Sequence, residues 1–485
     1  MVKSSGRERY NKLKIILISI AIALSIGIGV FVGDAGIILP VGAIALAILV
    51  GIELYFIKKP NAIIWVLLCF IFTFMILTRE IGGGPFGIMQ EGIMILGCLT
   101  LIFSPDEQNW KTLNNDLCLL MLTWLIISVL EIANPAGASV QGWLQEIRAA
   151  ALYPFLVVVI GFLVLKRNRD LNVFLGLIIG FSLLAAFNGM KQLYIGLSPG
   201  EQRFIDEGGY VTHILFGRLR VFSFYSDAGQ FGASQAHIGL IALVLSLGPF
   251  KMWKRVLLFI ASLILLYGML ISGTRGAIFA LIVGVFVALV LSKKFKVMII
   301  GGLIACSFLF VLKYTYIGNS NYEIYRLRTA FDPKEASFNV RITNQQILRE
   351  YLSTRPLGGG LGVIGVWGLE YNKDKFLSTI APDSYWVKVW AMYGIVGFVI
   401  WFGIMMYILG KCCGIVWNIK DERLKIKMIA LTSGFAGILI CSYGNEVINT
   451  APSSYIVYIS WVLVFLGPKI DEELRKKVNI PLVQD

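Results

Sequence analysis

Arginine residues stand in three separated stretches of this sequence that also carry glycine and hydroxyl or aromatic residues. Arg218 and Arg220 lie in FGRLRVFSFYSDAGQFG, Arg275 in SGTRGA and Arg341 in NVRITNQQ. A guanidinium binds phosphate through two parallel hydrogen bonds and stays charged in a dry site, so arginine suits a pyrophosphate better than lysine does. These residue types therefore favour a site that binds a pyrophosphate group.

Carboxylate and imidazole side chains offer proton acceptors for such a site. Asp383, in APDSYWVKVW, is our candidate for a general base or a ligand of an acceptor hydroxyl, and the alternative is an N-cap beside Ser384. His213 lies near Arg218 and is a candidate for substrate binding, whereas His237 lies in an apolar run and is expected in the core. Two histidines without a carboxylate at ligand spacing make no zinc site. We expect no metal and no cofactor.

The composition decides which kind of protein must position these residues. Of 485 residues, 57% are hydrophobic and only 15% are charged, and the mean hydropathy is +0.77. Soluble proteins average about 45–50% apolar and about 25% charged residues. The chain is therefore expected to be an integral membrane protein, and soluble enzymes, secreted disulfide scaffolds and disordered proteins are excluded. The seven cysteines fall within apolar runs or at their edges and are interpreted as small core residues.

Apolar runs predict an all-α polytopic membrane protein with about fourteen transmembrane helices, since a bilayer requires about 17–25 apolar residues. The run at 86–103 is the weakest because it contains Gln90 and Glu91. The fourteen runs lie near 15–32, 36–57, 61–78, 86–103, 117–133, 149–165, 171–190, 229–250, 256–272, 276–292, 297–313, 385–409, 428–447 and 452–467.

Lysine and arginine predict the orientation, because they are enriched in cytoplasmic loops. Loops rich in lysine and arginine alternate along the chain with loops that carry fewer of them. If the basic loops are cytoplasmic, both termini also lie in the cytoplasm. The formal net charge of +14 then belongs to the cytoplasmic face. It reports membrane orientation and implies no nucleic-acid partner.

This topology divides the chain around two long outer segments. We expect helices 1–7 in 1–190, a first long outer loop in 191–228, helices 8–11 in 229–313, a large catalytic outer loop in 314–384, helices 12–14 in 385–467 and a cytoplasmic tail in 468–485. Loops longer than about 12–15 residues are usually functional or disordered, and the aromatic content here favours function. In the larger loop, ASFNVRITNQQILREYLSTRP predicts an amphipathic helix that ends before Pro356, and LGGGLG (357–362) predicts a turn with close backbone approach.

Five arginines fall on the predicted outer side: Arg148, which begins a helix, and Arg218, Arg220, Arg275 and Arg341. A single arginine at a membrane boundary is usually a snorkelling anchor. Several on one face, flanking both long loops, favour a different role. We interpret them as ligands of a lipid-linked pyrophosphate.

Four stretches, in this order, resemble the bacterial O-antigen ligase and O-antigen polymerase family: RLRVFSFYSDAGQFGAS (218–234), ISGTRGAIFALIVGVFVALVLS (271–292), VRITNQQILREYLSTRPLGGGLG (340–362) and APDSYWVKVWAMYGIVGF (381–398). The resemblance covers about residues 200–400. It implies an all-helical membrane glycosyltransferase of the C type with an undecaprenyl-pyrophosphate glycan as donor. Transfer would occur at the outer leaflet, with inversion and without metal.

The resemblance also assigns residues. Arg220, Arg275 and Arg341 would bind the donor pyrophosphate and neutralise the charge that develops as it leaves. Where the ligases usually show a histidine followed by Asn or Ser, this chain has Asp383 and Ser384. That departure favours a polymerase.

The leading hypothesis is a polysaccharide polymerase of the bacterial inner membrane that transfers a glycan between undecaprenyl-pyrophosphate carriers, with its active site on the periplasmic face. A ligase that passes the glycan to lipid A core or another envelope acceptor is the alternative. A lipid-linked oligosaccharide flippase or other transporter is a second alternative, and a structural scaffold a third. The expected partners are the lipid-linked oligosaccharide and membrane lipids, with a chain-length regulator left open.

Overall fold

The computed structural model describes residues 14–15, 18–19, 50–82, 86–103, 110–215, 217–293, 295–320, 322–331, 336–382 and 384–478. Helices dominate these residues. The strands described among them are β1 (Ile214–Leu215) and β2 (Arg218–Leu219), which pair antiparallel. The chain is thus an all-α, multi-pass membrane protein, as the composition predicts.

Nine helices in the described part of the chain are long and apolar enough to cross a membrane. A tenth span arises if α20 (Ser453–Phe465) and α21 (Gly467–Val478), which meet at 49°, are counted as one. The nine are α3 (Ala62–Ile81), α4 (Phe86–Phe103), α5 (Asp116–Leu130) extended by a short turn to Ala133, α6 (Val140–Ile147) joined to α7 (Tyr153–Val164) by a π-helical turn, α8 (Asn168–Tyr194), α11 (Ala228–Ser246), α12 (Met252–Ile271), α18 (Tyr385–Asn418) and α19 (Glu422–Cys441).

The predicted runs from 61–78 onward all contain helix. Two of them form the apolar helices α13 (Gly276–Leu291) and α14 (Phe295–Tyr314), which are not among these nine. Most of the runs 15–32 and 36–57 lies outside the described residues. The total of fourteen helices therefore stays a prediction.

Helix α11 lies at the centre of the bundle and is almost entirely buried. It packs against α12, α13, α19 and α8. Small residues make this close packing attainable: a Cβ at Gly232 would lie 2.2 Å from the Ser272 hydroxyl oxygen. In membrane bundles such small residues let backbones approach closely, since hydrocarbon supplies no hydrophobic force between helices.

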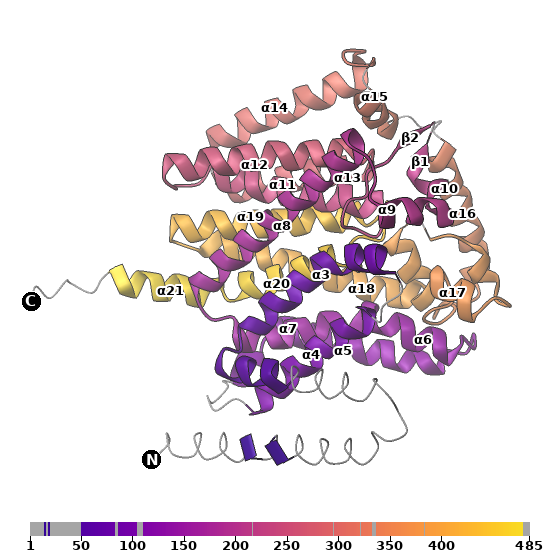
Figure 1. Cartoon of the computed structure of the whole chain (residues 1–485), viewed down its shortest axis with the longest axis horizontal. Coiled ribbons are helices and arrows are strands. Elements are labelled where there is room, and N and C mark those ends of the chain that lie inside the picture. The colour runs from indigo at the N-terminus through magenta and orange to yellow at the C-terminus, as the bar shows by residue number, and fades with distance from the viewer. Residues whose placement is uncertain are drawn as a thin grey trace, which may run out of the picture.

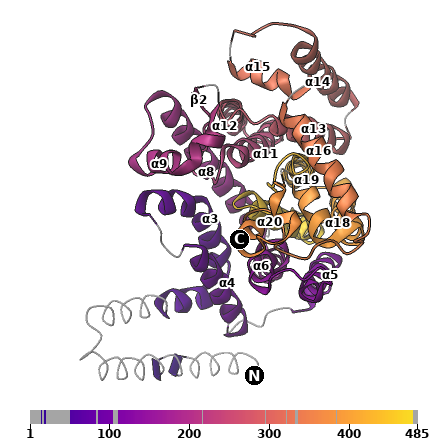
Figure 2. The same cartoon turned by 90° about the vertical axis from the view of Figure 1, so that its right-hand side faces the viewer.

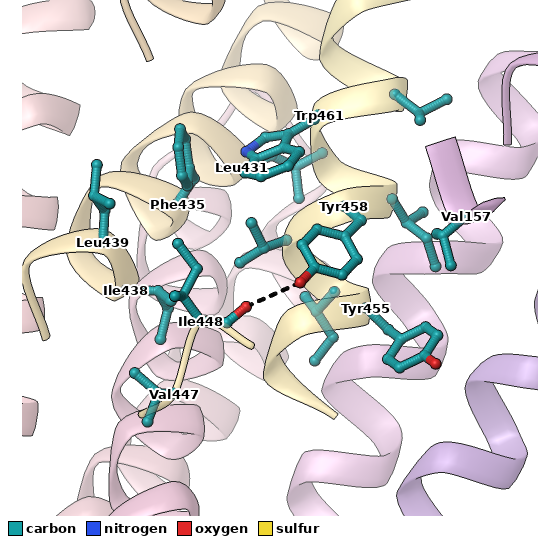
Figure 3. Packing of buried hydrophobic residues seen from close by; sticks show 14 of the residues in the cluster. Val157, Leu431, Phe435, Ile438, Leu439, Val447, Ile448, Tyr455, Tyr458 and Trp461 are labelled. Atoms are coloured by element: carbon teal, nitrogen blue, oxygen red, sulfur yellow. Dashed lines mark hydrogen bonds between the residues drawn. The ribbon is translucent and has the colours of Figure 1, made fainter. Parts of the chain in front are cut away.

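A second packed region joins α19, α20 and α7 (Figure 3). Phe435 and Trp461 meet edge to face with ring centres 5.1 Å apart, and the Tyr458 hydroxyl donates to the Ile448 carbonyl at 3.3 Å. Val157 from α7 belongs to the same hydrophobic cluster. This region supports residues 442–449, the first part of the connection from α19 to α20, which we call the 442–449 loop.

The connections between helices separate into two ends of the bundle (Figure 1). Lys427 donates to Asn168 and Asn172, and Lys293 donates to the Trp417 carbonyl, so the linkers at these residues meet at one end, which we call the basic end. At the other end, the loop end, lie α9 (Pro199–Phe204), α10 (Tyr210–His213), β1, β2, α15 (Tyr322–Arg328), α16 (Ala336–Leu352) and α17 (Val366–Tyr371). Figure 2 looks onto the loop end, where these elements surround the ends of the long helices.

Helix α16 occupies the stretch in which the spacing predicts an amphipathic helix, and it ends before Pro356. Leu348 and Leu352 are buried, whereas Ile342 on another face is exposed. The glycine-rich segment that follows does approach another backbone closely, and that backbone is α18. Its Gly359 amide donates to the Ala391 carbonyl at 2.9 Å.

Candidate functional site

Arg79, at the end of α3, fixes the segment that leads into α11. Its guanidinium donates to the carbonyls of Ser223 at 2.9 Å and Ser226 at 3.0 Å. The same group lies 4.5 Å from the ring centres of Phe204 and Phe222. Arg79 is not among the site residues predicted from the sequence, although its charge at the edge of an apolar run was an available signal.

His213 is buried inside this segment between the rings of Phe204 and Phe222, 5.2 and 5.1 Å away. Its Nδ1 lies 3.0 Å from the Gly209 carbonyl, and its Nε2 accepts a hydrogen bond from the Ala228 amide at 3.3 Å. Burial lowers the pKa of the imidazole. In this placement His213 ties the segment to the start of α11, and its contact with substrate stays a prediction.

A pocket of about 220 Å³ opens beside β2 at the loop end. Arg218 and Arg220 line it together with Glu323 from α15. Arg220 also donates to the Thr212 carbonyl at 3.0 Å. The remaining lining is the backbone of Gly273 and the apolar residues Leu193, Leu219, Leu270 and Ile271. Two guanidinium groups beside an apolar wall suit an anionic group that is attached to a lipid.

The turn between α12 and α13 forms one side of this pocket through Gly273. The Thr274 hydroxyl donates to the Ala228 carbonyl at 2.8 Å, so the turn is fastened to the first residue of α11. Arg326 of α15 donates to the Gly273 carbonyl at 2.7 Å. Arg275 follows within this turn as the residue before α13. The structure thus brings Arg275 to the same end as Arg218 and Arg220.

Arg341 reaches from α16 to the C-terminal end of α19. A Cβ at Gly444 would lie 3.6 Å from its Nη1, and the guanidinium acts electrostatically on Cys441. Helix C-termini carry partial negative charge and favour a cation. Gly276, next to Arg275, lies against the Cys441 sulfur as well. The Arg275 turn and Arg341 therefore meet on the end of one helix.

Arg148 occupies a different wall of the molecule. Its Nη1 forms an ion pair of 2.7 Å with Glu91 of α4, and the Tyr153 hydroxyl donates to the same carboxylate at 2.6 Å. Arg148 also donates to Gln145. The ion pair with Arg148 offsets the cost of placing the Glu91 carboxylate inside the apolar run of α4. Substrate binding by Arg148 stays a prediction.

Asp383 lies outside the described residues, so its role as a base stays a prediction. The adjacent Ser384 is the N-cap of α18, with its hydroxyl accepting from the Val387 amide at 3.3 Å. The Tyr385 amide donates to the Ser442 carbonyl at 3.0 Å. The start of α18 is therefore attached to the 442–449 loop.

A charged cluster that was not predicted from the sequence lies at this junction. Lys388 of α18 lies 3.1 Å from Glu146 of α6 and 3.1 Å from Glu446 of the 442–449 loop. A lysine inside the apolar run 385–409 was the available signal, because intramembrane charges are rare and usually paired. Across the described ranges, no three His, Cys, Asp or Glu side chains come together as metal ligands would.

Comparison with known proteins identifies part of the chain. Residues 260–402 match the O-antigen ligase family. These residues run from α12 into α18 and include the turn with Arg275, the Arg341 helix and the cap of α18. No curated protein matches the chain. The match confirms the resemblance to O-antigen polymerases and ligases, and it supports a function of that type for this membrane protein.

Proposed function

We propose that this protein is a polysaccharide polymerase that transfers a glycan from undecaprenyl pyrophosphate to a lipid-linked repeat unit. The reaction would take place at the outer leaflet of the bacterial inner membrane, with the loop end on the periplasmic face. The observation that carries the proposal is the pocket lined by Arg218 and Arg220, which meets the Arg275 turn of the matched segment.

The donor fits this pocket by its chemistry. Its pyrophosphate carries negative charge that guanidinium groups bind bidentately, and its polyprenyl chain requires apolar surface. The pocket offers two guanidinium groups, the Glu323 carboxylate and four apolar side chains, so positive charge exceeds negative charge by one in its lining. As the sugar leaves, charge grows on the pyrophosphate, and fixed cations at the pocket would stabilise that transition state more than the ground state.

The distribution of charge between the two ends supports the orientation. Six lysines lie in or next to the linkers α7–α8, α11–α12, α13–α14 and α18–α19 of the basic end: Lys166, Lys251, Lys254, Lys293, Lys420 and Lys425. Positive residues favour the cytoplasmic side. The loop end would then face the periplasm, where glycan acceptors are presented.

A ligase is the second candidate, because the matched family bears that name. Both enzymes would use the same donor and the same arginines. They differ in the acceptor, which is another lipid-linked repeat unit for a polymerase and lipid A core or another envelope molecule for a ligase.

Substitution of Arg341 tests the proposal. The glycan ladder is measured in a deletion strain of the host that is complemented with each variant at matched protein levels. We expect Arg341→Ala to lower the rate of transfer by about 10²–10³, as removal of one charge-stabilising donor does. Arg341→Lys should rescue little, since lysine lacks the bidentate geometry. Arg349→Ala changes an exposed arginine of the same helix and should leave the glycan ladder intact.

The glycans that accumulate decide between the two enzymes. Loss of the ladder with single repeat units still delivered to their final acceptor indicates a polymerase. Polymer that accumulates on the lipid carrier indicates a ligase. A normal ladder in Arg341→Ala would contradict both. Asp383→Ala, examined in parallel, tests the predicted role of that residue.

A further inference from the structure

Helix α16, which carries Arg341, and the first turns of α18 and α11 all contact the 442–449 loop, which lies outside the matched segment. Arg341 of α16 lies against Gly444, and the Tyr385 amide at the start of α18 bonds to Ser442. The loop also touches the start of α11, since the side chains of Asn445 and Asp227 both lie against Gly229. This short loop therefore contacts α16, α18 and α11 together.

The backbone at Glu446 is fixed in place. Its carbonyl accepts hydrogen bonds from Gln230 Nε2 of α11 at 3.0 Å and from the Thr450 hydroxyl at 2.6 Å. Its side chain is fixed too, by the contact of 3.1 Å with Lys388 Nζ. A group held by both backbone and side chain keeps its orientation, which is what a catalytic group requires.

The two carboxylates on Lys388 differ in their access to solvent. The Glu146 side chain is 2% exposed and Lys388 is 9% exposed, whereas the Glu446 side chain is 28% exposed. Lys388 and Glu146 are thus shielded from solvent, whereas Glu446 is partly exposed. Of these three charged groups, Glu446 is the one that an incoming molecule can reach.

The position of Glu446 relative to Arg341 suits a transfer reaction. Gly444 and Glu446 are two residues apart, and two residues span at most about 7 Å. The Arg341 guanidinium of α16, which would bind the donor, and the Glu446 carboxylate, which would face the acceptor, would then lie beside and on the same short loop, respectively. The acceptor hydroxyl must lose its proton as it attacks, and a carboxylate within reach can take that proton.

We propose that Glu446 is the general base that accepts the proton of the attacking acceptor hydroxyl, with Lys388 and Glu146 as positioning residues. In this proposal Asp383 keeps the other role predicted for it, that of a ligand of the acceptor hydroxyl. This inference rests on the proposed function. The hydroxyl oxygen forms a bond to the anomeric carbon of the donor sugar, and the bond from that carbon to the pyrophosphate oxygen breaks. The electron pair leaves with the pyrophosphate. The hydroxyl proton passes to the Glu446 carboxylate and then to water.

The charged groups around Glu446 tune its basicity in opposite directions. Burial raises the pKa of its carboxyl, Lys388 lowers it, and the negative charges of Glu146 and Asp227 raise it. The net effect is a raised pKa, which makes the Glu446 carboxylate a stronger base than that of an exposed glutamate.

The test compares Glu446→Gln with Glu131→Gln in the complemented deletion strain. Glu131 is a matched control: it is also a partly buried glutamate of the loop end, but it bonds to Asn134, on another wall. We expect Glu446→Gln to lower transfer by at least about 10² while Glu131→Gln keeps the ladder. Purified Glu446→Gln should still be stabilised thermally by undecaprenyl pyrophosphate to the same extent as the wild type.

These outcomes separate the two proposals. A wild-type protein that undecaprenyl pyrophosphate does not stabilise, or a deletion strain that keeps its ladder, would overturn the proposed function. A normal ladder with Glu446→Gln, in a strain whose ladder depends on the wild-type protein, would overturn only the role of Glu446.

A pH profile distinguishes catalysis from a structural role and does not depend on whether Glu446→Gln inserts. The wild-type transfer rate in membrane vesicles should fall as the pH falls through the pKa of Glu446, because the base must be ionised. Lys388→Gln removes the positive charge that lowers this pKa, so the acid limb should move to higher pH. A wild-type rate that does not decrease in acid, or a limb that Lys388→Gln does not move, would overturn the inference.

Discussion

The partners of each cation at the loop end decide what that cation can do. Arg79 donates to carbonyls of the segment before α11, and Arg148 pairs with Glu91. Such contacts build structure, because each one satisfies a polar group that would otherwise be buried at a cost of about 1–3 kcal/mol. Arg218 and Arg220 also line a pocket, although Arg220 donates to the Thr212 carbonyl as well. The residue type alone does not distinguish these roles.

His213 supplies a prediction at the same scale. Burial lowers its pKa in the folded state, against the raising influence of Gly209 and Asp227 and with a lowering influence of Arg220 and Arg79. The unfolded chain, with a pKa of about 6.5, therefore takes up the proton first as the pH falls. The stability due to neutral His213 is present above about pH 6.5 and is lost below it.

We expect the melting temperature of the wild-type protein in detergent to fall more between pH 7.5 and pH 5.5 than that of His213→Asn, which lacks the titrating group. Thermal unfolding at the two pH values checks this. Equal shifts in both proteins would show that the imidazole does not carry this pH dependence.

Among the elements, α18 is shaped by one residue that breaks its helical geometry. Gly394 has φ 67° and ψ −170°, and a Cβ there would lie 2.0 Å from the Pro356 carbonyl oxygen. At this break the glycine-rich segment after α16 docks on α18, with the Gly360 amide donating to the Met392 carbonyl at 2.9 Å. The break therefore couples the Arg341 helix to the helix that holds Lys388.

Gly394→Ala should lower the free energy of unfolding by about 3 kcal/mol, through positive-φ strain and the clash with Pro356. Gly403→Ala is the matched control on the same helix, since a Cβ there meets no atom within 4 Å. The melting temperature and the amount of folded protein in the membrane measure the effect. Two variants with equal stability would contradict this account of the break.

Across the whole molecule, the two ends carry different chemistry. The linkers of the basic end hold lysines, and the loop end holds the pocket and the charged cluster of Lys388, Glu146 and Glu446. The bundle between them is apolar and places these ends on opposite sides of a bilayer. Function and orientation are therefore linked, because the substrate of the pocket must be presented on the side that the loop end faces.

Cysteine labelling tests this orientation in a chain from which the seven native cysteines have been removed. Asn344→Cys on α16 should react with a membrane-impermeant thiol reagent added from the periplasmic side. Lys420→Cys at the basic end should react after the cytoplasmic side is opened. Labelling of Asn344→Cys from the cytoplasm alone would place the proposed site on the wrong face.

Much of the fold was predictable because its signals are local. Apolar runs mark helices wherever about 17–25 residues must sit in hydrocarbon, and all runs after residue 60 contain helix. The amphipathic spacing of α16 and its end before Pro356 are also local. The limits of this approach appear at α13, which is shorter than a full span, and at α20, where the chain bends into α21.

The sequence by itself determined a multi-pass helical membrane protein, the positions of its long helices after residue 60, and a resemblance that the match to residues 260–402 bears out. These follow from composition and from patterns within a few turns of chain. Only the tertiary structure decided that Lys388 pairs with both Glu146 and Glu446, and that Arg341 of α16 contacts the loop that carries Glu446. Those partners are far apart in the chain and meet through helix packing, which no local pattern encodes.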